Sequence, residues 1–176
     1  MYRDNTLLPS EAIRLLALGI LADGPRSYSD LATDVRHFSG RIVGPSLDLV
    51  GTPLELLKVE GLIAACPGRD GEDGPLAITE AGKAEMRRLL TSGVRAPVTE
   101  LNKLIIALKM RFLHLLSADE QRLQLELLVE MSERELARLT DLSANLEDAA
   151  GLLTSWLAQE TAQAAERLAW YRERLD

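Results

Sequence analysis

Apolar residues recur at helical spacing along most of the chain, and the breaks between these stretches predict where helices begin and end. In the first predicted helix, which ends at Asp23-Gly24-Pro25, apolar positions cover more than one face, so we expect burial on two sides. A second helix is predicted from Ser27-Tyr28-Ser29-Asp30, where a hydroxyl can cap the first turn. A turn at Ser39-Gly40-Arg41 is expected to end it. Gly44-Pro45 then opens a third helix, which runs to Glu60.

Two short apolar runs after this helix predict a β-hairpin. Residues 62–65 and 76–78 are too short for helices, and the loop between them, residues 67–75, is rich in glycine and proline. Thr79 can cap the next helix. The third helix gains an apolar stripe from Leu47, Val50, Leu54, Leu57 and Val59. The order helix, helix, hairpin is that of a winged helix-turn-helix, a module whose common use is reading DNA.

The pattern changes at residues 93–97, where glycine and proline indicate a domain boundary. Every later signal is helical, and Ser117-Ala118-Asp119-Glu120 forms a capping box at the start of a long helix. The apolar spacings mix threes and fours, which favours a helical hairpin or bundle that buries its stripe against a partner. We therefore predict a mainly α protein with a small β-hairpin wing. Its winged helix-turn-helix domain spans residues 1–95, and its C-terminal helical dimerisation domain spans residues 96–176.

The composition is that of a soluble globular protein, with 47% hydrophobic and 27% charged residues among 176. A single cysteine excludes an internal disulfide framework, so a reducing cytoplasm is the expected location. We expect no membrane span and no signal peptide. The net charge of −7 provides no global attraction to nucleic acid, so DNA contacts would depend on a local arrangement of basic side chains.

Several short motifs, in their order and spacing, resemble the PadR-like family of winged helix-turn-helix transcriptional regulators. In the N-terminal half the motifs are Leu18-Gly19-Ile20-Leu21-Ala22-Asp23-Gly24-Pro25, Tyr28, Leu31-Ala32, Leu57, Glu60-Gly61-Leu62-Ile63 and Ile78-Thr79-Glu80-Ala81-Gly82-Lys83. In the C-terminal half they are Leu108-Lys109-Met110-Arg111-Phe112, Leu116-Ser117-Ala118-Asp119-Glu120-Gln121 and Leu168-Ala169-Trp170-Tyr171-Arg172-Glu173.

This resemblance implies a homodimeric regulator, often a repressor, whose C-terminal helices pair the subunits and whose winged helices meet successive major grooves. Small phenolic or drug-like effectors release some members from DNA. The chain departs from the family where a Thr-Leu-Tyr-Pro run is usual, because Leu49-Val50-Gly51-Thr52 stands there. The alternative is therefore a winged-helix protein that has lost DNA binding and acts as a protein-interaction or ligand-sensing module.

Basic and polar residues around the module are the candidate DNA contacts. Tyr28 and Ser29 correspond to phosphate contacts of the family, at a helix N-terminus that favours anions. Arg36 and Arg41 either touch phosphates or belong to a solvated turn. The complete candidate set is Arg26, Tyr28, Ser29, Arg36, Arg41, Ser46, Lys58, Arg69 and Lys83.

The charge balance of the same region predicts weak non-specific binding. The recognition helix contains one basic residue, Lys58, and three acidic ones, Asp48, Glu55 and Glu60. The loop has the same balance, with Arg69 as its one base and three acids: Asp70, Glu72 and Asp73. Few phosphates can then be neutralised unless four other basic residues converge on one face: Arg26, Arg36, Arg41 and Lys83.

The remaining chemistry-bearing residues indicate no catalytic site. His37, His114 and Cys66 have no ligand-like spacing, so we expect no metal and no cofactor. No nucleophile has a recognisable partner, so we expect no enzyme. Three aromatic residues either line an effector pocket between helices of a dimer or pack the helical interface: Trp156, Trp170 and Tyr171.

Overall fold

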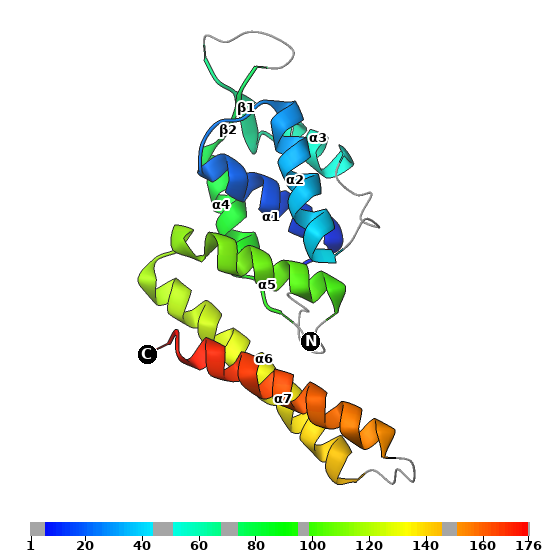
Figure 1. The fold of residues 1–176 in the computed structure, drawn as a ribbon. Helices are drawn as coiled ribbons and strands as arrows, with labels where there is room; N and C mark the ends of the chain where they lie inside the picture. The colour runs from blue at the N-terminus through cyan, green and yellow to red at the C-terminus, as the bar shows by residue number, and fades with distance from the viewer. Residues whose placement is uncertain (1–5, 44–50, 68–73, 95–98, 146–150, 176) are drawn as a thin grey trace, which may run out of the picture. The chain divides into compact units, whose positions relative to one another are not determined.

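The computed structural model describes residues 6–43, 51–67, 74–94, 99–145 and 151–175 (Figure 1). These residues are mostly helical, with one two-stranded antiparallel sheet. The chain divides into two compact units. The first unit comprises residues 1–93 and 98–116, and the second comprises residues 94–97 and 117–176. The sequence analysis placed the division at residue 95. In the structure, the helix after that point belongs to the first unit, whereas the predicted boundary assigns it to the C-terminal domain.

The element order agrees with the predicted one and is compatible with a winged helix. The first unit contains α1 (Pro9–Ala22), α2 (Tyr28–Val43), α3 (Gly51–Val59), β1 (Ile63–Ala65), β2 (Leu76–Ile78), α4 (Glu80–Leu90), α5 (Glu100–Phe112) and the 3-10 turn η1 (Leu113–Leu115). The second unit contains α6 (Ala118–Ala144) and α7 (Leu152–Arg172).

Predicted helix starts are confirmed by side-chain caps. Ser27 Oγ accepts a hydrogen bond of 3.1 Å from the Asp30 amide before α2, and Thr79 Oγ1 accepts one of 3.0 Å from the Gly82 amide at α4. At α6 the capping box is complete, because the Ser117 amide donates to Glu120 Oε2 at 3.1 Å and Ser117 Oγ accepts from the Glu120 amide at 3.5 Å. These caps satisfy amides that have no partner within their own helix.

The predicted turn at residues 39–41 is wrong, because α2 continues through it to Val43. Ser39 is buried, and its hydroxyl donates to the Val35 carbonyl at 2.8 Å, so its polar group is satisfied inside the helix. Gly40 is tolerated at this point at a cost of up to about 1 kcal/mol relative to alanine. The predicted helix start at Gly44-Pro45 lies outside the described residues.

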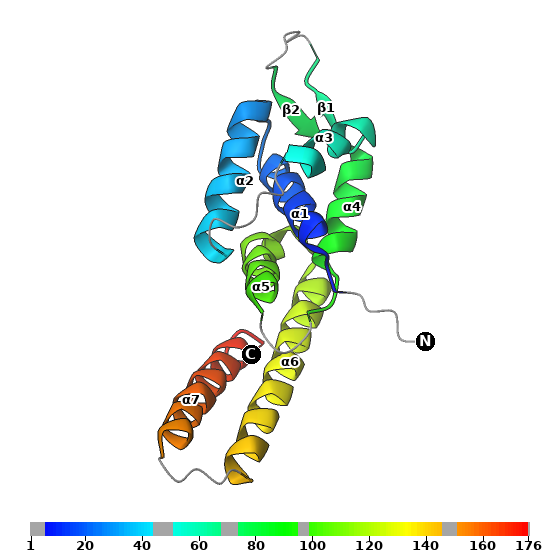
Figure 2. The ribbon, with the colours of Figure 1, turned by 90° about the vertical axis from the view of Figure 1, so that its right-hand side faces the viewer.

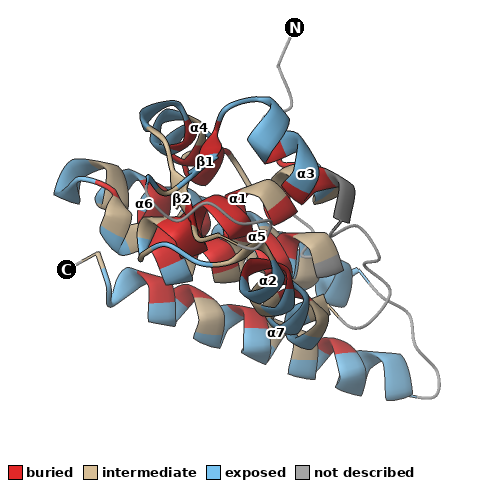
Figure 3. Cartoon of the chain, turned by 90° about the horizontal axis from the view of Figure 1, so that it is seen from above, coloured by how far each residue is buried: buried red, intermediate tan, exposed pale blue. Residues whose placement is uncertain are grey.

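Helix α1 forms the centre of the first unit, and its burial on more than one side is confirmed (Figure 3). It contacts α2, α3, α4, α5 and β2. The expected core residues Leu54 and Leu57 of α3 are buried, as is Leu31 of α2. The prediction fails at Val59, which leaves 82% of its side chain exposed.

The hairpin pairs Ile63 with Ile78 and Ala65 with Leu76. The segment that leads into α2 lies against the other edge of β2, because the Arg26 amide donates to the Leu76 carbonyl at 3.1 Å. The Leu76 amide returns a bond of 2.7 Å to the Arg26 carbonyl. These two bonds fix the N-terminus of α2 beside the hairpin.

Helix α5 covers the side of α1 that faces away from the sheet (Figure 2). Its Lys109 is 1% exposed, and the Nζ donates to the carbonyl oxygens of Leu90 at 2.7 Å and Ser92 at 2.6 Å. These carbonyls belong to the end of α4, where a cation complements the helix dipole. Arg111 lies 4.7 Å from the ring centre of Phe38 on α2.

In the second unit α6 and α7 pack together as a helical hairpin (Figure 1). Ion pairs join the two helices, with Arg172 Nη2 2.6 Å from Glu133 Oε1 and Arg167 Nη2 3.5 Å from Glu135 Oε2. Large apolar side chains remain exposed on the hairpin: Leu123, Leu127, Leu142, Leu152, Leu153, Trp156 and Trp170. Within the described ranges, no helix has the length and hydrophobicity needed to cross a membrane.

Candidate nucleic-acid interface

The N-terminus of α2, the outer face of α3 and the β-hairpin surround a cavity of about 340 Å³, which we call the α3 cavity. Its lining consists of Tyr28, Glu55, Lys58, Val59, Ala65, Gly74 and Leu76. The structure therefore brings together two of the predicted DNA contacts, Tyr28 and Lys58, which are separated by the length of α2 and the following segment in the sequence. Glu55 lies on the same face of α3, one helical turn before Lys58.

Charges at the start of α2 are already compensated in part. Arg26 lies 3.4 Å from the Asp34 carboxylate, and the Ser27 hydroxyl donates a hydrogen bond of 2.9 Å to the Asp30 carboxylate. The Asp30 carboxylate occupies the first turn, where the helix dipole favours an anion. Exposed Ser29 is available to a phosphate, but the attraction of this helix end is reduced by its own acid.

Arg36 and Arg41 are exposed but lie far from this end of α2. Arg41 is thirteen residues beyond Tyr28, which corresponds to about 20 Å along a helix. Figures 1 and 2 show α2 running from the hairpin toward α5. Arg41 therefore cannot share a phosphate with Tyr28, and its predicted role would require a different stretch of DNA backbone. Arg36 is eight residues beyond Tyr28, or about 12 Å along the helix.

Lys83 is placed on α4, where its Nζ lies 2.6 Å from Glu80 Oε1. It lines another cavity of about 510 Å³, together with Arg87, the end of α1 and Leu115. The structure does not bring Lys83 to the α3 cavity. Ser46 and Arg69, the other predicted contacts, lie outside the described residues.

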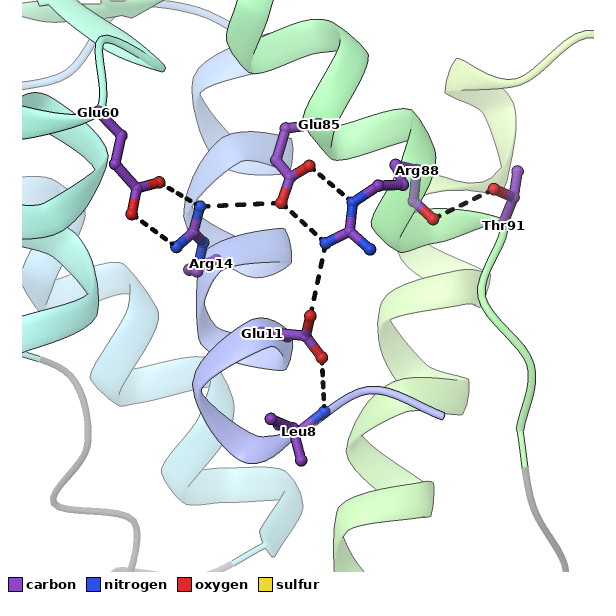
Figure 4. A network of polar contacts seen from close by, with 7 residues as sticks. All are labelled: Leu8, Glu11, Arg14, Glu60, Glu85, Arg88 and Thr91. Carbon is purple, nitrogen blue, oxygen red and sulfur yellow. Dashed lines mark hydrogen bonds and ion pairs between the residues drawn. The ribbon is translucent and has the colours of Figure 1, made fainter. Parts of the chain in front are cut away.

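A chain of ion pairs connects the end of α3 to α1 and α4 (Figure 4). Arg14 binds Glu60 with both terminal nitrogens, at 3.1 and 2.5 Å, and lies 3.7 Å from Glu85. Arg88 in turn contacts Glu85 at 2.7 Å and Glu11 at 3.4 Å. The hydrogen bond from Arg88 lowers the pKa of Glu85, and the same bond raises the pKa of Arg88.

This network changes the charge that α3 presents. Glu60 is neutralised by Arg14, so the sequence count overstated the acidity at the end of the helix. Among the described charged side chains of α3, Glu55 and Lys58 balance each other. Sequence reasoning missed Arg14, although an arginine flanked by Ile13 and Leu15 in an apolar helix is a signal of a specific partner.

The buried Lys109 was also missed. Burial lowers its pKa from 10.5 to about 7. Its position was the available signal, because it lies four residues after Ile105 and three before Phe112, and therefore on the apolar face of α5. It holds the end of α4 and does not reach the α3 cavity.

The predicted effector residues all lie on α7, but only two of them meet. The rings of Trp170 and Tyr171 are 5.4 Å apart in an edge-to-face arrangement. Tyr171 is buried, which raises its pKa, whereas Trp170 is 41% and Trp156 is 53% exposed. Trp156 lies fourteen residues before Trp170, or about 21 Å along the helix. Within one chain the three residues therefore do not line a single small cavity.

In the described parts of the chain, no group of three or more His, Cys, Asp and Glu side chains is placed to hold a metal ion. In the comparison with protein families, residues 2–175 match the family described as "Putative AphA-like transcriptional regulator". No curated protein matches the sequence. The family match covers both units and indicates a transcription regulator.

Proposed function

The chain belongs to the family of AphA-like transcriptional regulators, and we propose that it binds operator DNA as a homodimer and represses the genes under that operator. In this proposal the first unit is a winged helix, with α3 as the recognition helix and the β1–β2 hairpin as the wing. The mode of binding is the one that the resemblance to PadR-like regulators implies. A small effector relieves the repression.

The observation that carries the proposal is the position of α3. Leu54 and Leu57 anchor one face of the helix in the core, while Glu55 and Lys58 stand exposed on the other. The Arg14–Glu60 contact fixes the end of the helix against α1. A helix held on one side and exposed on the other, next to a hairpin, has the form required to enter a major groove.

The second unit supports the homodimer. The exposed apolar side chains of the α6–α7 hairpin include Leu152, Leu153 and Trp156 at neighbouring positions of one helix. Contiguous apolar surface of this kind commonly marks an interface, and the most frequent arrangement of identical chains is a two-fold dimer. A second copy of the hairpin would bury this surface.

A second function has an observation of its own in its favour. Val59 and Leu56 are exposed apolar residues on the outer face of α3, and the described part of that helix carries no net positive charge. Such a surface is also suited to binding a protein or a small ligand. In that case the chain would act as an interaction or sensing module without contact to DNA.

Fluorescence anisotropy with the purified full-length protein distinguishes these functions. Labelled duplexes that tile the region upstream of its own gene are titrated at several salt concentrations, with a random duplex as competitor. We expect saturable binding to at least one duplex, and the random competitor should not displace it. The salt dependence of this binding should be shallow, because each neutralised phosphate adds about 0.9 to the slope and few phosphates are neutralised. Lys58→Gln should weaken this binding, and Arg122→Gln on α6 should not. Absence of binding to every duplex at low salt would refute the DNA-binding proposal and favour the sensing module.

A further inference from the structure

We propose that the α3 cavity binds a small zwitterion with an apolar body, of the class of α-amino acids with apolar side chains, and that this ligand competes with DNA. The first part of the proposal is independent of the proposed function. Only the second part, the competition, rests on it.

Two opposite charges at the cavity have no partners in the part of the chain that the structure describes. Glu55 and Lys58 both line the cavity, and within the described ranges neither side chain forms a hydrogen bond or ion pair. Charged residues three apart on a helix lie close enough to pair with each other. Because they do not, an ammonium group can approach Glu55 while a carboxylate approaches Lys58.

The remaining walls of the cavity are mainly apolar. Val59 contributes a side chain that is 82% exposed, and Ala65 and Leu76 line the cavity from the hairpin. The Tyr28 ring adds an aromatic face with a hydroxyl group at its tip. A ligand with an apolar side chain would cover Val59, which the described residues of its own unit leave exposed.

Size and charge limit the choice of ligand. A volume of about 340 Å³ is at the lower end of the range for small-molecule sites, about 300–1,000 Å³, so the ligand is small. A free nucleotide enclosed in the cavity would place several negative charges beside Glu55 with a single basic side chain to bind them, which disfavours a ligand of net negative charge there. The cavity beside α4 differs in this respect, because its Lys83 is already paired with Glu80.

The same residues explain the competition with DNA. Tyr28 and Lys58 are candidate phosphate contacts, and α3 is the proposed recognition helix. A carboxylate bound to Lys58 removes that cation from a phosphate, and the body of the ligand covers the outer face of α3. Ligand and DNA therefore exclude each other, without any change in the fold.

The ligand arm of the test uses the full-length protein without DNA. Calorimetric titration compares phenylalanine and leucine with phenethylamine and 3-phenylpropionate, which each carry only one of the two charges. We expect the amino acids to bind with the higher affinity. Glu55→Gln and Lys58→Gln should each weaken amino-acid binding about 2–10-fold, as expected for the loss of one partly exposed charge contact. Arg122→Gln, on α6 of the second unit, should leave it unchanged.

Three results would overturn the ligand site: no binding of either amino acid, equal binding of the singly charged compounds, or insensitivity to both variants. The double variant Glu55→Lys with Lys58→Glu provides a further check, because exchanging the charges should preserve binding to a zwitterion. In the DNA arm, added amino acid should raise the apparent dissociation constant of a bound duplex. If it does not, the competition is refuted. If no duplex binds at all, the proposed function fails while the ligand arm still decides the site.

Discussion

The ring of Phe112 on α5 occupies the space that a side chain at Gly19 on α1 would need. A Cβ atom placed on Gly19 would lie 2.5, 2.6 and 2.7 Å from the Cζ, Cε2 and Cε1 atoms of that ring. Phe112 is fully buried, so the ring cannot turn out into solvent to make room. The two helices approach each other this closely only because position 19 lacks a side chain.

Gly19→Ala should therefore destabilise the protein, although alanine is the better helix former. We expect a loss of about 1–3 kcal/mol in the free energy of unfolding, measured by urea denaturation, because the added methyl overpacks the core. Gly40→Ala on α2 is the matched control, since a Cβ atom at that position would meet no described atom within 4 Å. That variant should gain about 0.5–1 kcal/mol. Equal stability of Gly19→Ala and the wild type would contradict the close contact.

Lys109 should make stability rise with pH above neutrality. Its pKa is 10.5 in its ordinary environment and about 7 when buried. Between these values the unfolded chain binds a proton that the folded chain does not, so the free energy of unfolding increases by about 1.4 kcal/mol per pH unit. Below pH 7 both states are charged and the dependence disappears. Urea unfolding at about pH 7.5 and about pH 9.5 measures the effect.

Lys109→Met is the comparison variant, because it retains an unbranched side chain of similar length without the charge. The substitution also removes the hydrogen bonds to the Leu90 and Ser92 carbonyls, so the free energy of unfolding of the variant should differ from that of the wild type at every pH. The quantity to compare is the change between the two pH values. We expect the wild type to gain about 2–3 kcal/mol more than the variant. Parallel pH profiles would show that the lysine keeps its charge when buried.

The Arg14–Glu60 contact should be a measurable coupling between α1 and the end of α3. A double-mutant cycle with Arg14→Met and Glu60→Gln should give an interaction energy of about 1 kcal/mol, since the pair is bidentate but partly exposed. The Glu130–Arg134 pair on α6 is the control, where an exposed pair of this spacing should give about 0.3–0.5 kcal/mol. A coupling at Arg14 no larger than the control would mean that the contact does not hold α3.

The homodimer should depend on exposed apolar residues of α7. Leu152→Glu combined with Trp156→Glu places two charges on one helical face and should give a monomer in sedimentation equilibrium at micromolar concentration. Because Leu152 is 78% and Trp156 is 53% exposed within the chain, the helix content by circular dichroism should be retained. Ala165→Glu is the control, because Ala165 is exposed nine residues after Trp156, on the opposite face of α7, and this variant should leave the dimer intact. A wild-type protein that sediments as a monomer would refute this proposal directly.

Local signals in the sequence were sufficient for the helix starts. The caps at Ser27, Thr79 and Ser117 depend on residues within one turn, which a sequence shows directly. Val59 failed because two residues beyond Leu57 correspond to about 200° around a helix, away from the buried face. The predicted turn at Gly40 failed because the buried hydroxyl of Ser39 is satisfied within the helix.

Contacts between distant segments were not accessible in the same way. The proximity of Tyr28 and Lys58 depends on how the N-terminus of α2 lies against the hairpin, through the paired backbone bonds of Arg26 and Leu76. The pairing of Glu60 with Arg14 joins residues 46 apart in the sequence. Single-residue patterns identify such groups as candidates, whereas their partners follow from tertiary packing.

The location of α5 determines where the protein can be divided. A fragment that stops at the glycine- and proline-rich stretch near residue 95 would keep every element expected of a winged helix but would lose the helix that covers α1. Gly19 would then face solvent, and the last carbonyls of α4 would lose the hydrogen bonds that Lys109 donates. The smallest fragment with an intact core should extend to residue 116. Chimeras that exchange the C-terminal helices between family members should be joined after η1, so that each α5 stays with the core that it completes.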